Sequence, residues 1–201
     1  NKQSFITDDC LKTFTYIDRH SGCVQPIPSY YDHDVLKELY YAMSKTRAAD
    51  TKAVNLQRTG LMSTYPSSRG QEAVGVAIGH AMQPSDIFCP YYRDQGALLL
   101  RGVSIADLYT LWGGDERGNL FPNNKLDLPT FEPIACQYLH ATGVAFALKH
   151  RQQKHAVVTT GGDGSTSKGD FYEAINLAGI WNLPLVFVIN NNQRAISVPR
   201  S

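Results

Sequence analysis

The feature that most constrains this fold is a pair of short apolar segments separated by one helical segment. Residues 156–160 form a run rich in β-branched side chains, and residues 185–189 read Leu-Val-Phe-Val-Ile. A fully apolar run of this length is typical of a strand buried on both faces of a parallel sheet. The helical segment carries its apolar residues on one stripe, formed by Phe171, Ala174, Ile175, Ala178 and Trp181. This order predicts one βαβ unit, whose right-handed crossover brings the carboxyl ends of both strands to the same edge of the sheet.

Polar residues follow both strands at that edge. Gly162-Asp163-Gly164 ends the first strand, and Asn190-Asn191-Asn192 ends the second. Either piece alone is typical of an ordinary turn, but both at matching strand ends favour a ligand site, because open α/β sheets bind ligands there. Carboxylate and carboxamide oxygens suit a hard cation such as Mg²⁺ or Ca²⁺. Flanking glycines and the N–H groups of the next helix can hold phosphate oxygens. The pattern therefore predicts a phosphate-bearing ligand bound through a divalent metal.

Other common phosphate and catalytic motifs are excluded by the residues themselves. The stretch GGDGSTSKGD lacks the dinucleotide fingerprint, because Ser167 stands where the third glycine would be. It also lacks the Lys-Ser/Thr pair of a nucleotide-binding P-loop, because Asp170 follows Gly169. No G-x-S-x-G sequence, the mark of a hydrolase nucleophile, occurs in the chain.

Apolar periodicity predicts the remaining elements of the chain. We expect a strand at residues 87–90 and helices at residues 34–46 (continuing toward Arg58), 70–82, after Ser104, and 136–150. The helix at 70–82 is rich in glycine and alanine, which predicts a buried helix that Gly75 and Gly79 allow to pack closely. Residues 113–133 are rich in Gly, Asn and Pro, so we expect a long loop that is functional or mobile.

The expected organisation is an extended arm over residues 1–33 and one α/β domain over residues 34–201. The arm has mixed polarity and carries Gly22, Pro26 and Pro28. The domain contains the βαβ unit and all the ligand-binding candidates. No internal repeat marks a further boundary.

Composition excludes several classes of protein. The chain has 201 residues and a net charge of +1, which excludes a nucleic-acid partner or a polybasic membrane-surface partner. The longest apolar run, residues 185–189, is far shorter than the ~20 residues that cross a bilayer. We see no secretory signal, and the four cysteines are scattered without a metal-binding spacing. These features predict a reduced, cytosolic protein.

Several short sequence motifs, in this order along the chain, resemble those of the E1 component α subunit of 2-oxo acid dehydrogenase complexes, most closely the bacterial pyruvate dehydrogenase type. The matching motifs are GQEA at 70–73, YRD at 92–94, GVAFALK at 143–149, GDGSTSKGDFYEAINLAG at 162–179 and NNQRAISVP at 191–199. The resemblance implies a thiamine diphosphate-binding fold, with a mostly parallel sheet flanked by helices. Relatives continue beyond the last residue given, so the resemblance also implies a chain truncated on its C-terminal side.

The resemblance assigns metal ligands and cofactor contacts. Magnesium would be bound by the Asp163 carboxylate, the Asn192 side chain and the backbone carbonyl of Arg194, where relatives frequently have an aromatic residue. The thiamine diphosphate would contact Tyr92, Arg93, Glu132, Ile134, Asp163, Gly164, Ser165 and Asn192. Among these, Gly164 and Ser165 would offer backbone N–H groups, Tyr92 and Arg93 would reach the diphosphate, and the Ile134 main chain would hold the aminopyrimidine. Tyr65 falls in the substrate-pocket segment of the family.

The implied reaction is oxidative decarboxylation of pyruvate with transfer of the acetyl group to the lipoyl domain of the E2 component. The catalytic glutamate of this family belongs to the β subunit, and the family's active-site histidine lies outside this chain. The resemblance therefore implies an enzyme active only in an α₂β₂ heterotetramer, located in the bacterial cytoplasm or in the mitochondrial matrix of a eukaryote. A branched-chain 2-oxo acid or acetoin dehydrogenase α subunit is the alternative substrate class. A non-catalytic chain that acts only in assembly is the alternative of another kind.

Overall fold

The computed structural model describes residues 15–18, 20, 22–122 and 126–199. The chain divides into two compact units, Asn1–Glu38 and Leu39–Ser201. In the described part of the first unit, Ile17 and Cys23 form an isolated antiparallel bridge. The Asp18 carboxylate closes the intervening turn by accepting hydrogen bonds of 2.8 Å from the backbone N–H groups of His20 and Gly22. The division into an arm over residues 1–33 and a domain over residues 34–201 stays a prediction.

Helix α1 (His33–Arg58) begins at the predicted place. The Asp32 carboxylate accepts hydrogen bonds from the backbone N–H groups of Asp34 and Val35, which otherwise have no helical partner. The helix continues to Arg58, as its apolar pattern predicts.

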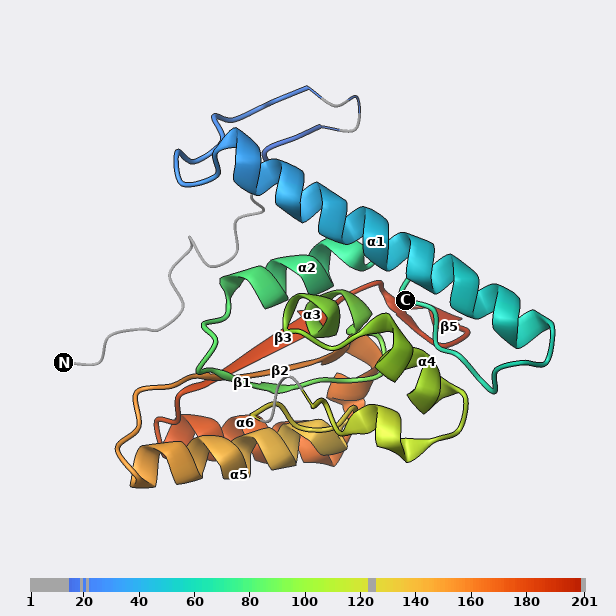
Figure 1. Cartoon of the computed structure of the whole chain (residues 1–201). Coiled ribbons are helices and arrows are strands. Elements are labelled where there is room, and N and C mark those ends of the chain that lie inside the picture. The colour runs from blue at the N-terminus through green and yellow to red at the C-terminus, as the bar shows by residue number, and fades with distance from the viewer. Residues whose placement is uncertain (1–14, 19, 21, 123–125, 200–201) are drawn as a thin grey trace. The chain divides into compact units, whose positions relative to one another are not determined.

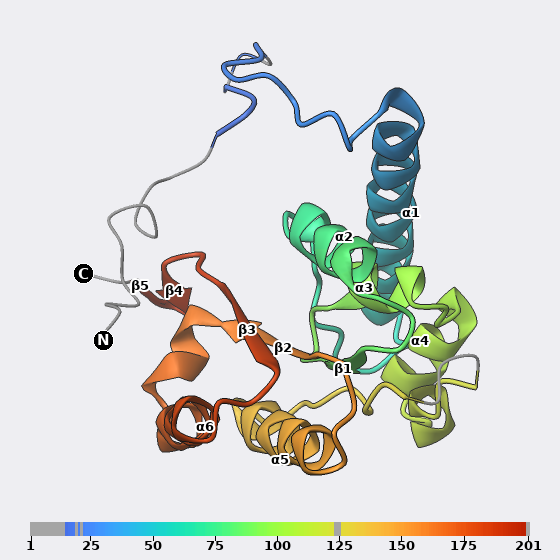
Figure 2. The ribbon, with the colours of Figure 1, turned by 90° about the vertical axis from the view of Figure 1, so that its left-hand side faces the viewer.

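The second unit is built on a three-stranded parallel sheet with the order β1-β2-β3. The strands are β1 (Ile87–Cys89), β2 (Val157–Gly162) and β3 (Leu185–Asn190). Helices α5 (Cys136–His150) and α6 (Gly169–Ile180) cover one face, while α2 (Glu72–Ala81) and α3 (Gln95–Leu100) lie on the other (Figures 1 and 2). This confirms the predicted α/β architecture of a parallel sheet flanked by helices.

The core alternates between the two faces of the sheet, as the pleat of a strand requires. Phe88 and Val158 pack toward α2 and α3, in a cluster that also contains Leu108 of α4 (Ile105–Trp112). The neighbouring residues Cys89 and Val157 pack toward α5. Strand β2 is therefore buried on both sides at the centre of the sheet.

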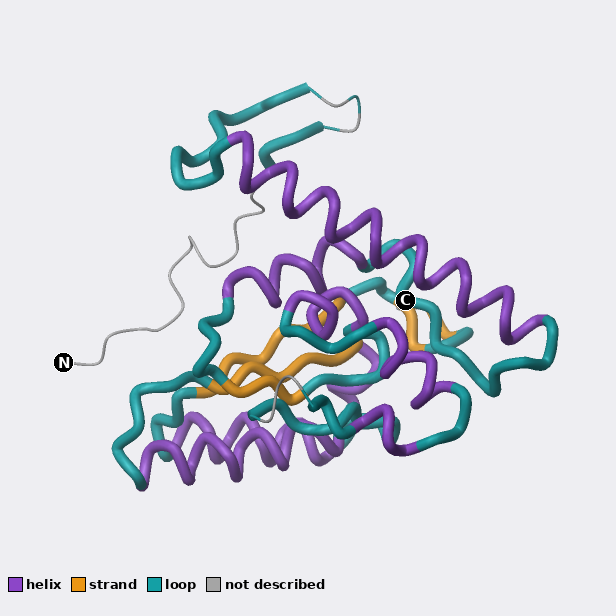
Figure 3. The backbone as a smooth tube through the Cα atoms, viewed as in Figure 1, coloured by secondary structure: helices purple, strands orange, loops and turns teal. Residues whose placement is uncertain are grey.

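The predicted βαβ unit is present, with one correction. Strand β2 leads through a 3₁₀ turn, η3 (Asp163–Ser167), into α6 and then β3 (Figure 3). The expectation that β3 is buried on both faces is wrong, because Val186 is 50% exposed. Phe187 and Ile189 pack against the cluster around Tyr138, but β3 is the edge strand of the described sheet.

The glycines of α2 lie at a close helix contact, as predicted, although only one face of the helix is buried. A Cβ on Gly75 would lie 3.2 Å from the backbone nitrogen of Ala97, and one on Gly79 would lie 2.9 Å from Leu100 Cβ. The opposite face is exposed at Val74, so the predicted buried helix is buried on one face and not on the other. Gly75 and Gly79 serve the contact with α3.

The region expected as one long loop, residues 113–133, contains a short 3₁₀ helix, η2 (Glu116–Asn119), and is anchored where it is described. Asp127 is buried, forms an ion pair of 2.6 Å with Arg101, and accepts a hydrogen bond of 2.9 Å from the backbone N–H of Phe88. The Phe121 side chain is in the core. After β3, a small antiparallel pair, β4 (Arg194–Ala195) and β5 (Val198–Pro199), ends the described chain. None of the helices in the described ranges is long and apolar enough to cross a membrane.

Candidate functional site

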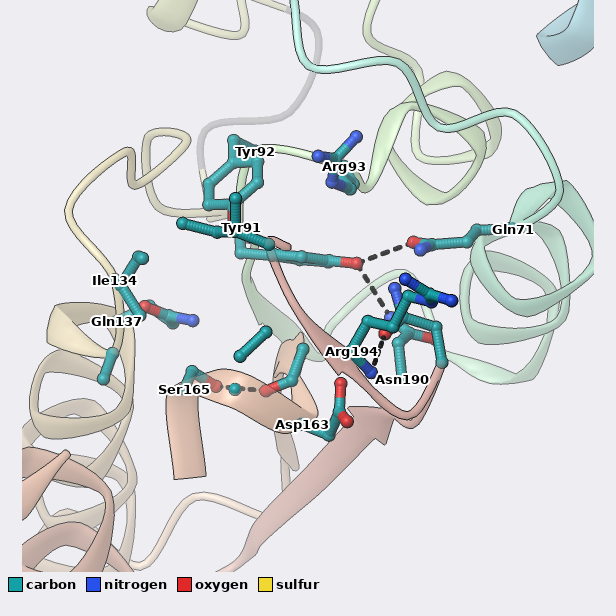
Figure 4. Close-up of a pocket in the computed structure, with 16 residues that line it drawn as sticks. Gln71, Tyr91, Tyr92, Arg93, Ile134, Gln137, Asp163, Ser165, Asn190 and Arg194 are labelled. Atoms are coloured by element: carbon teal, nitrogen blue, oxygen red, sulfur yellow. Dashed lines mark hydrogen bonds between the residues drawn. The ribbon is translucent and has the colours of Figure 1, made fainter. Parts of the chain in front are cut away.

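Residues from the carboxyl ends of all three parallel strands meet around one cavity of about 440 Å³. Tyr91 follows β1, Asp163 follows β2 and Asn190 ends β3, with Gly162 and Asn190 paired in register. This is the edge at which open α/β sheets bind ligands, and the volume lies within the range of small-molecule sites. Figure 4 shows the side chains that surround the cavity.

Asp163 carries the clearest sign of a missing partner. Its Oδ1 atom is buried and has no hydrogen-bond partner among the described residues. A buried carboxylate oxygen without a partner is costly, because it has lost water and gained nothing in exchange. A cation in the cavity would supply that partner, so the Asp163 carboxylate fits a metal ligand.

Asn192 and Arg194, the other two predicted metal ligands, line the same cavity from the exposed segment 191–199. The Asn192 Oδ1 accepts a hydrogen bond of 2.9 Å from the backbone N–H of Arg194, which brings the two residues into one tight turn. That oxygen keeps a second lone pair for a cation. The segment also approaches η3 closely, because a Cβ on Gly164 would lie 2.9 Å from Ala195 Cβ.

The donor set suits a hard divalent cation rather than a softer metal. One carboxylate, one carboxamide and one backbone carbonyl are all oxygen ligands of the kind that Mg²⁺ takes. No group of three or more His, Cys, Asp and Glu side chains gathers within the ranges that the structure describes. A site of this kind therefore needs further oxygen ligands from the bound molecule.

A buried tyrosine contacts and fixes the turn that follows β2. The Tyr138 hydroxyl lies 2.7 Å from Ser165 Oγ, and Ser165 Oγ in turn donates to the Gly162 carbonyl. Burial is the main cause that raises the pKa of Tyr138, which keeps the phenol neutral. Gly161 leaves room for that hydroxyl, since a Cβ there would lie only 1.9 Å from it. In the first turn of η3, the backbone N–H of Gly164 has no intrahelical partner and can donate to a ligand.

Tyr92 and Arg93, which the resemblance assigns to the diphosphate, also line the cavity. The Arg93 guanidinium donates to the Ser67 carbonyl, and its Cζ atom lies 5.5 Å from the centroid of the Tyr92 ring. The carbonyl uses part of the donor fork, and the remaining N–H groups can meet an anion.

The start of α5 forms the wall of the cavity that includes Ile134 and Gln137. Ala135, between them, has a φ of 73°, a left-handed conformation that turns the chain sharply into the helix. The Gln137 Nε2 donates to the Thr160 carbonyl at 2.8 Å, while its Oε1 is buried without a partner among the described residues. Gln137 was not predicted from the sequence, since nothing in its spacing separates it from core residues of the same helix.

Two predicted residues lie elsewhere. Glu132 is exposed and does not line this cavity. Tyr65 is buried against Trp112, and its hydroxyl donates to Asp50 Oδ1 at 3.1 Å. Burial and the nearby Asp50 charge raise the pKa of Tyr65, so its phenol stays protonated. Tyr65 supports the 65–68 segment that receives Arg93, but it does not itself line the cavity.

Three further polar side chains that line the cavity were not among the predicted cofactor or metal contacts. Gln71 lies within the GQEA motif, Tyr91 directly precedes YRD, and Asn190 opens the Asn triplet. The Tyr91 hydroxyl donates to Gln71 Oε1 at 2.8 Å and accepts from Asn190 Nδ2 at 3.1 Å (Figure 4). Their positions within or beside the recognised motifs were the signal by which the sequence could have identified them.

Asp94 lies behind the site and is fully buried. Its carboxylate accepts from the Tyr91 backbone N–H at 2.9 Å and from the Thr160 hydroxyl. Burial raises the pKa of Asp94 to about 7, although both hydrogen bonds act in the opposite direction. The residue joins the loop after β1 to the end of β2.

Comparison with known proteins identifies the family to which the chain belongs. Residues 40–201 match the model of the family described as dehydrogenase E1 component. The chain is 40% identical over 162 residues to the pyruvate dehydrogenase E1 component subunit alpha of Mycoplasma genitalium, covering 81% of this chain and 45% of that protein. It is 38% identical over 175 residues to the protein of the same name in Staphylococcus aureus, covering 87% and 47%.

A third relative has a different name. The 3-methyl-2-oxobutanoate dehydrogenase subunit alpha of Mycobacterium tuberculosis is 40% identical over 168 residues, covering 84% of this chain and 46% of that protein. The chain thus spans about half the length of the curated relatives it matches. With a family match over most of its residues, the chain belongs to the dehydrogenase E1 component family.

Proposed function

We propose that this chain is the part of a 2-oxo acid dehydrogenase E1 α subunit that holds Mg²⁺ and thiamine diphosphate, and that the complete enzyme acts on pyruvate. The observation that carries the proposal is the buried Oδ1 of Asp163, which has no hydrogen-bond partner in the described part of the chain. Asp163 follows β2 and lines the cavity together with Asn192 and Arg194. The family match and the α-subunit names of the relatives support the same assignment.

In this proposal the chain supplies three oxygen ligands to the metal. They are the Asp163 carboxylate, the Asn192 carboxamide and the Arg194 carbonyl. Mg²⁺ takes near-octahedral oxygen coordination, so diphosphate oxygens and water would complete its shell. The metal would thereby join the ends of β2 and β3 to the ligand.

The remaining lining residues would orient the organic part of the ligand. The N–H groups of Gly164 and Ser165 would donate to the diphosphate, together with the Tyr92 hydroxyl and the Arg93 guanidinium. The Ile134 main chain would hold the aminopyrimidine at the opposite wall. Glu132 is proposed beside it from the family resemblance, although its side chain does not line the cavity.

When bound, thiamine diphosphate supplies the nucleophilic carbon and the electron sink for decarboxylation, while the protein supplies binding and orientation. The residues of this chain that line the cavity serve in binding, and we assign none of them a proton-transfer role. We therefore propose that the active enzyme pairs this subunit with an E1 β subunit in an α₂β₂ heterotetramer. It would deliver the acetyl group to the lipoyl domain of an E2 component, in the bacterial cytoplasm or the matrix of a mitochondrion.

Substrate choice is the finer part of the proposal. Two relatives named as pyruvate dehydrogenase subunits support pyruvate, while the relative named for 3-methyl-2-oxobutanoate makes a branched-chain 2-oxo acid the second candidate. The two substrates differ by two methyl groups on the carbon next to the carbonyl.

Turnover of the full-length α subunit with its β subunit tests the substrate. We expect kcat/KM for pyruvate to exceed that for 3-methyl-2-oxobutanoate by about tenfold or more, since a pocket can discriminate to that extent on small apolar groups. Acetoin serves as a third substrate in the same assay. Preference for the branched substrate or for acetoin would overturn the pyruvate proposal and leave the cofactor site untouched.

A further inference from the structure

Tyr91 is the one described side chain whose hydroxyl joins the start of α2 to the end of β3 at the cavity. Its phenol donates to Gln71 Oε1 at 2.8 Å and accepts from Asn190 Nδ2 at 3.1 Å. The side chain is 3% exposed, so water does not readily replace either bond. In Figure 4 its ring crosses the view between the Arg93 guanidinium and Arg194.

The backbone of Tyr91 is fixed independently of its hydroxyl. Its N–H lies 2.9 Å from Asp94 Oδ2 and 3.3 Å from Thr160 Oγ1, so the residue is anchored to β2. An isolated parallel bridge to Phe131 holds it on the other side. The phenol therefore extends from a fixed backbone position to the end of β3.

A fixed contact at the end of β3 matters, because the segment with the proposed metal ligands that follows it is exposed. Residues 191–199 are all exposed, and two of them, Gln193 and Ile196, have φ values of 61° and 56°. Within the segment, the Asn191 and Asn192 side-chain oxygens accept short-range hydrogen bonds from the backbone N–H groups two residues further on. The position of Asn192 relative to Asp163 therefore depends on where Asn190 is held, together with the close approach of Ala195 to Gly164.

We propose that the Tyr91 hydroxyl is a positioning group for the metal site, holding Asn190 so that Asn192 and Arg194 face Asp163. The inference rests on the proposed function and extends it, since Tyr91 touches neither the metal nor the diphosphate in this assignment. Tyr91 acts through Asn190. It is a residue of the site that lies outside the recognised motifs.

The test compares two phenylalanine variants of the full-length chain in complex with its β subunit. Tyr91→Phe removes the hydroxyl at the site. Tyr109→Phe removes the hydroxyl of a half-buried tyrosine, which donates to the Ala49 carbonyl at 2.8 Å and does not line the cavity. Mg²⁺ is titrated by calorimetry at saturating thiamine diphosphate. We expect the Kd for Mg²⁺ to rise about fivefold or more in Tyr91→Phe and to stay within about twofold of the wild type in Tyr109→Phe.

A ligand-free readout separates this inference from the proposed function. Hydrogen exchange of the amides in residues 191–199 should be faster in Tyr91→Phe, while exchange in residues 157–160 of β2 stays unchanged. The double variant Tyr91→Phe with Asn190→Ala should bind Mg²⁺ about as weakly as the weaker of the two single variants, because each single change already removes the bond between Tyr91 and Asn190. Wild-type Mg²⁺ affinity and wild-type exchange in Tyr91→Phe would overturn the positioning role. Absence of Mg²⁺-dependent binding in the wild type itself would instead overturn the proposed function.

Discussion

At the scale of single residues, two adjacent glycines at the end of β2 have different tasks. A Cβ on Gly161 would lie 1.9 Å from the Tyr138 hydroxyl, whereas one on Gly162 would meet nothing within 4 Å. We expect Gly161→Ala to lower the free energy of unfolding by about 1–3 kcal/mol, as overpacking does in a core. Gly162→Ala, at a φ of −82°, should change it by less than about 0.5 kcal/mol.

Urea unfolding of both variants, without ligand, measures this difference. The pair is well matched, because the two residues are neighbours on the same strand and receive the same substitution. Equal free energies of unfolding for Gly161→Ala and the wild type would show that the contact between Gly161 and Tyr138 is not tight.

A second residue-scale prediction concerns the pH dependence of stability. Burial raises the pKa of Asp94 to about 7 from an ordinary value of 3.8, so the folded state favours the protonated carboxyl. The folded chain then binds more protons than the unfolded chain between these values, and stability falls as pH rises from about 4 to 7, by up to ~1.4 kcal/mol per pH unit. Above pH 7 this effect is complete.

The variant Asp94→Asn isolates that effect, because the carboxamide does not titrate. We expect the stability difference between the wild type and Asp94→Asn to shift against the wild type by roughly 2–4 kcal/mol between pH 5 and pH 8. Urea unfolding of both proteins across this pH range gives the difference in their free energies of unfolding. The contributions of the other titrating groups cancel in that difference. Parallel stability curves would contradict the raised pKa.

The sequence indicated the polar residues that have a chemical signature and missed those that act through position. Asp163 and Asn192 were predicted because they follow two strands of one βαβ unit. Tyr91 and Gln137 look like ordinary aromatic and helical residues until the fold brings them to the cavity. Their roles depend on contacts with residues far away in the chain, which spacing alone does not encode.

At the scale of elements, the contact between α2 and α3 depends on glycine. A Cβ on Gly79 would lie 2.9 Å from Leu100 Cβ and 3.1 Å from the Ala97 carbonyl oxygen, whereas one on Gly143 in α5 would meet nothing within 4 Å. We expect Gly79→Ala to destabilise the protein by about 1–3 kcal/mol. Gly143→Ala should stabilise it by about 0.5–1 kcal/mol, because alanine is the better helix former.

Thermal unfolding of the two variants tests this opposition, since one shifts the midpoint down and the other shifts it up. Both substitutions add the same methyl group inside a helix, so helix propensity alone would raise both midpoints. A rise for Gly79→Ala would therefore contradict the close packing of α2 on α3.

Most elements could be predicted, because capping and periodicity are local. Ser104 forms a capping box with Asp107 at the start of α4, as its sequence indicates. The burial of β3 could not be predicted, because an apolar run shows what a strand can bury and not which neighbours it has. The anchoring of the 113–133 region was also hidden, since it depends on the distant pairing of Asp127 with Arg101.

At the scale of the whole molecule, the described sheet gathers three strand ends into one site. The chain covers 45–47% of the length of its named relatives, and β3 lies at the edge of the sheet with Val186 half-exposed. The α/β class and the family could both be established from this part alone. Activity, substrate and subunit partners belong to the complete protein and are tested there.

The most direct test of the account is calorimetric binding of thiamine diphosphate to the full-length chain with its β subunit. Wild-type protein in Mg²⁺ is compared with the same protein in EDTA and with Asp163→Asn in Mg²⁺. We expect the affinity to fall by about tenfold or more in EDTA and in the variant. Ligand-free unfolding should be similar for both proteins, because Asp163 Oδ1 has no partner in the described chain. Binding of equal strength in EDTA, or in Asp163→Asn, would contradict the metal site.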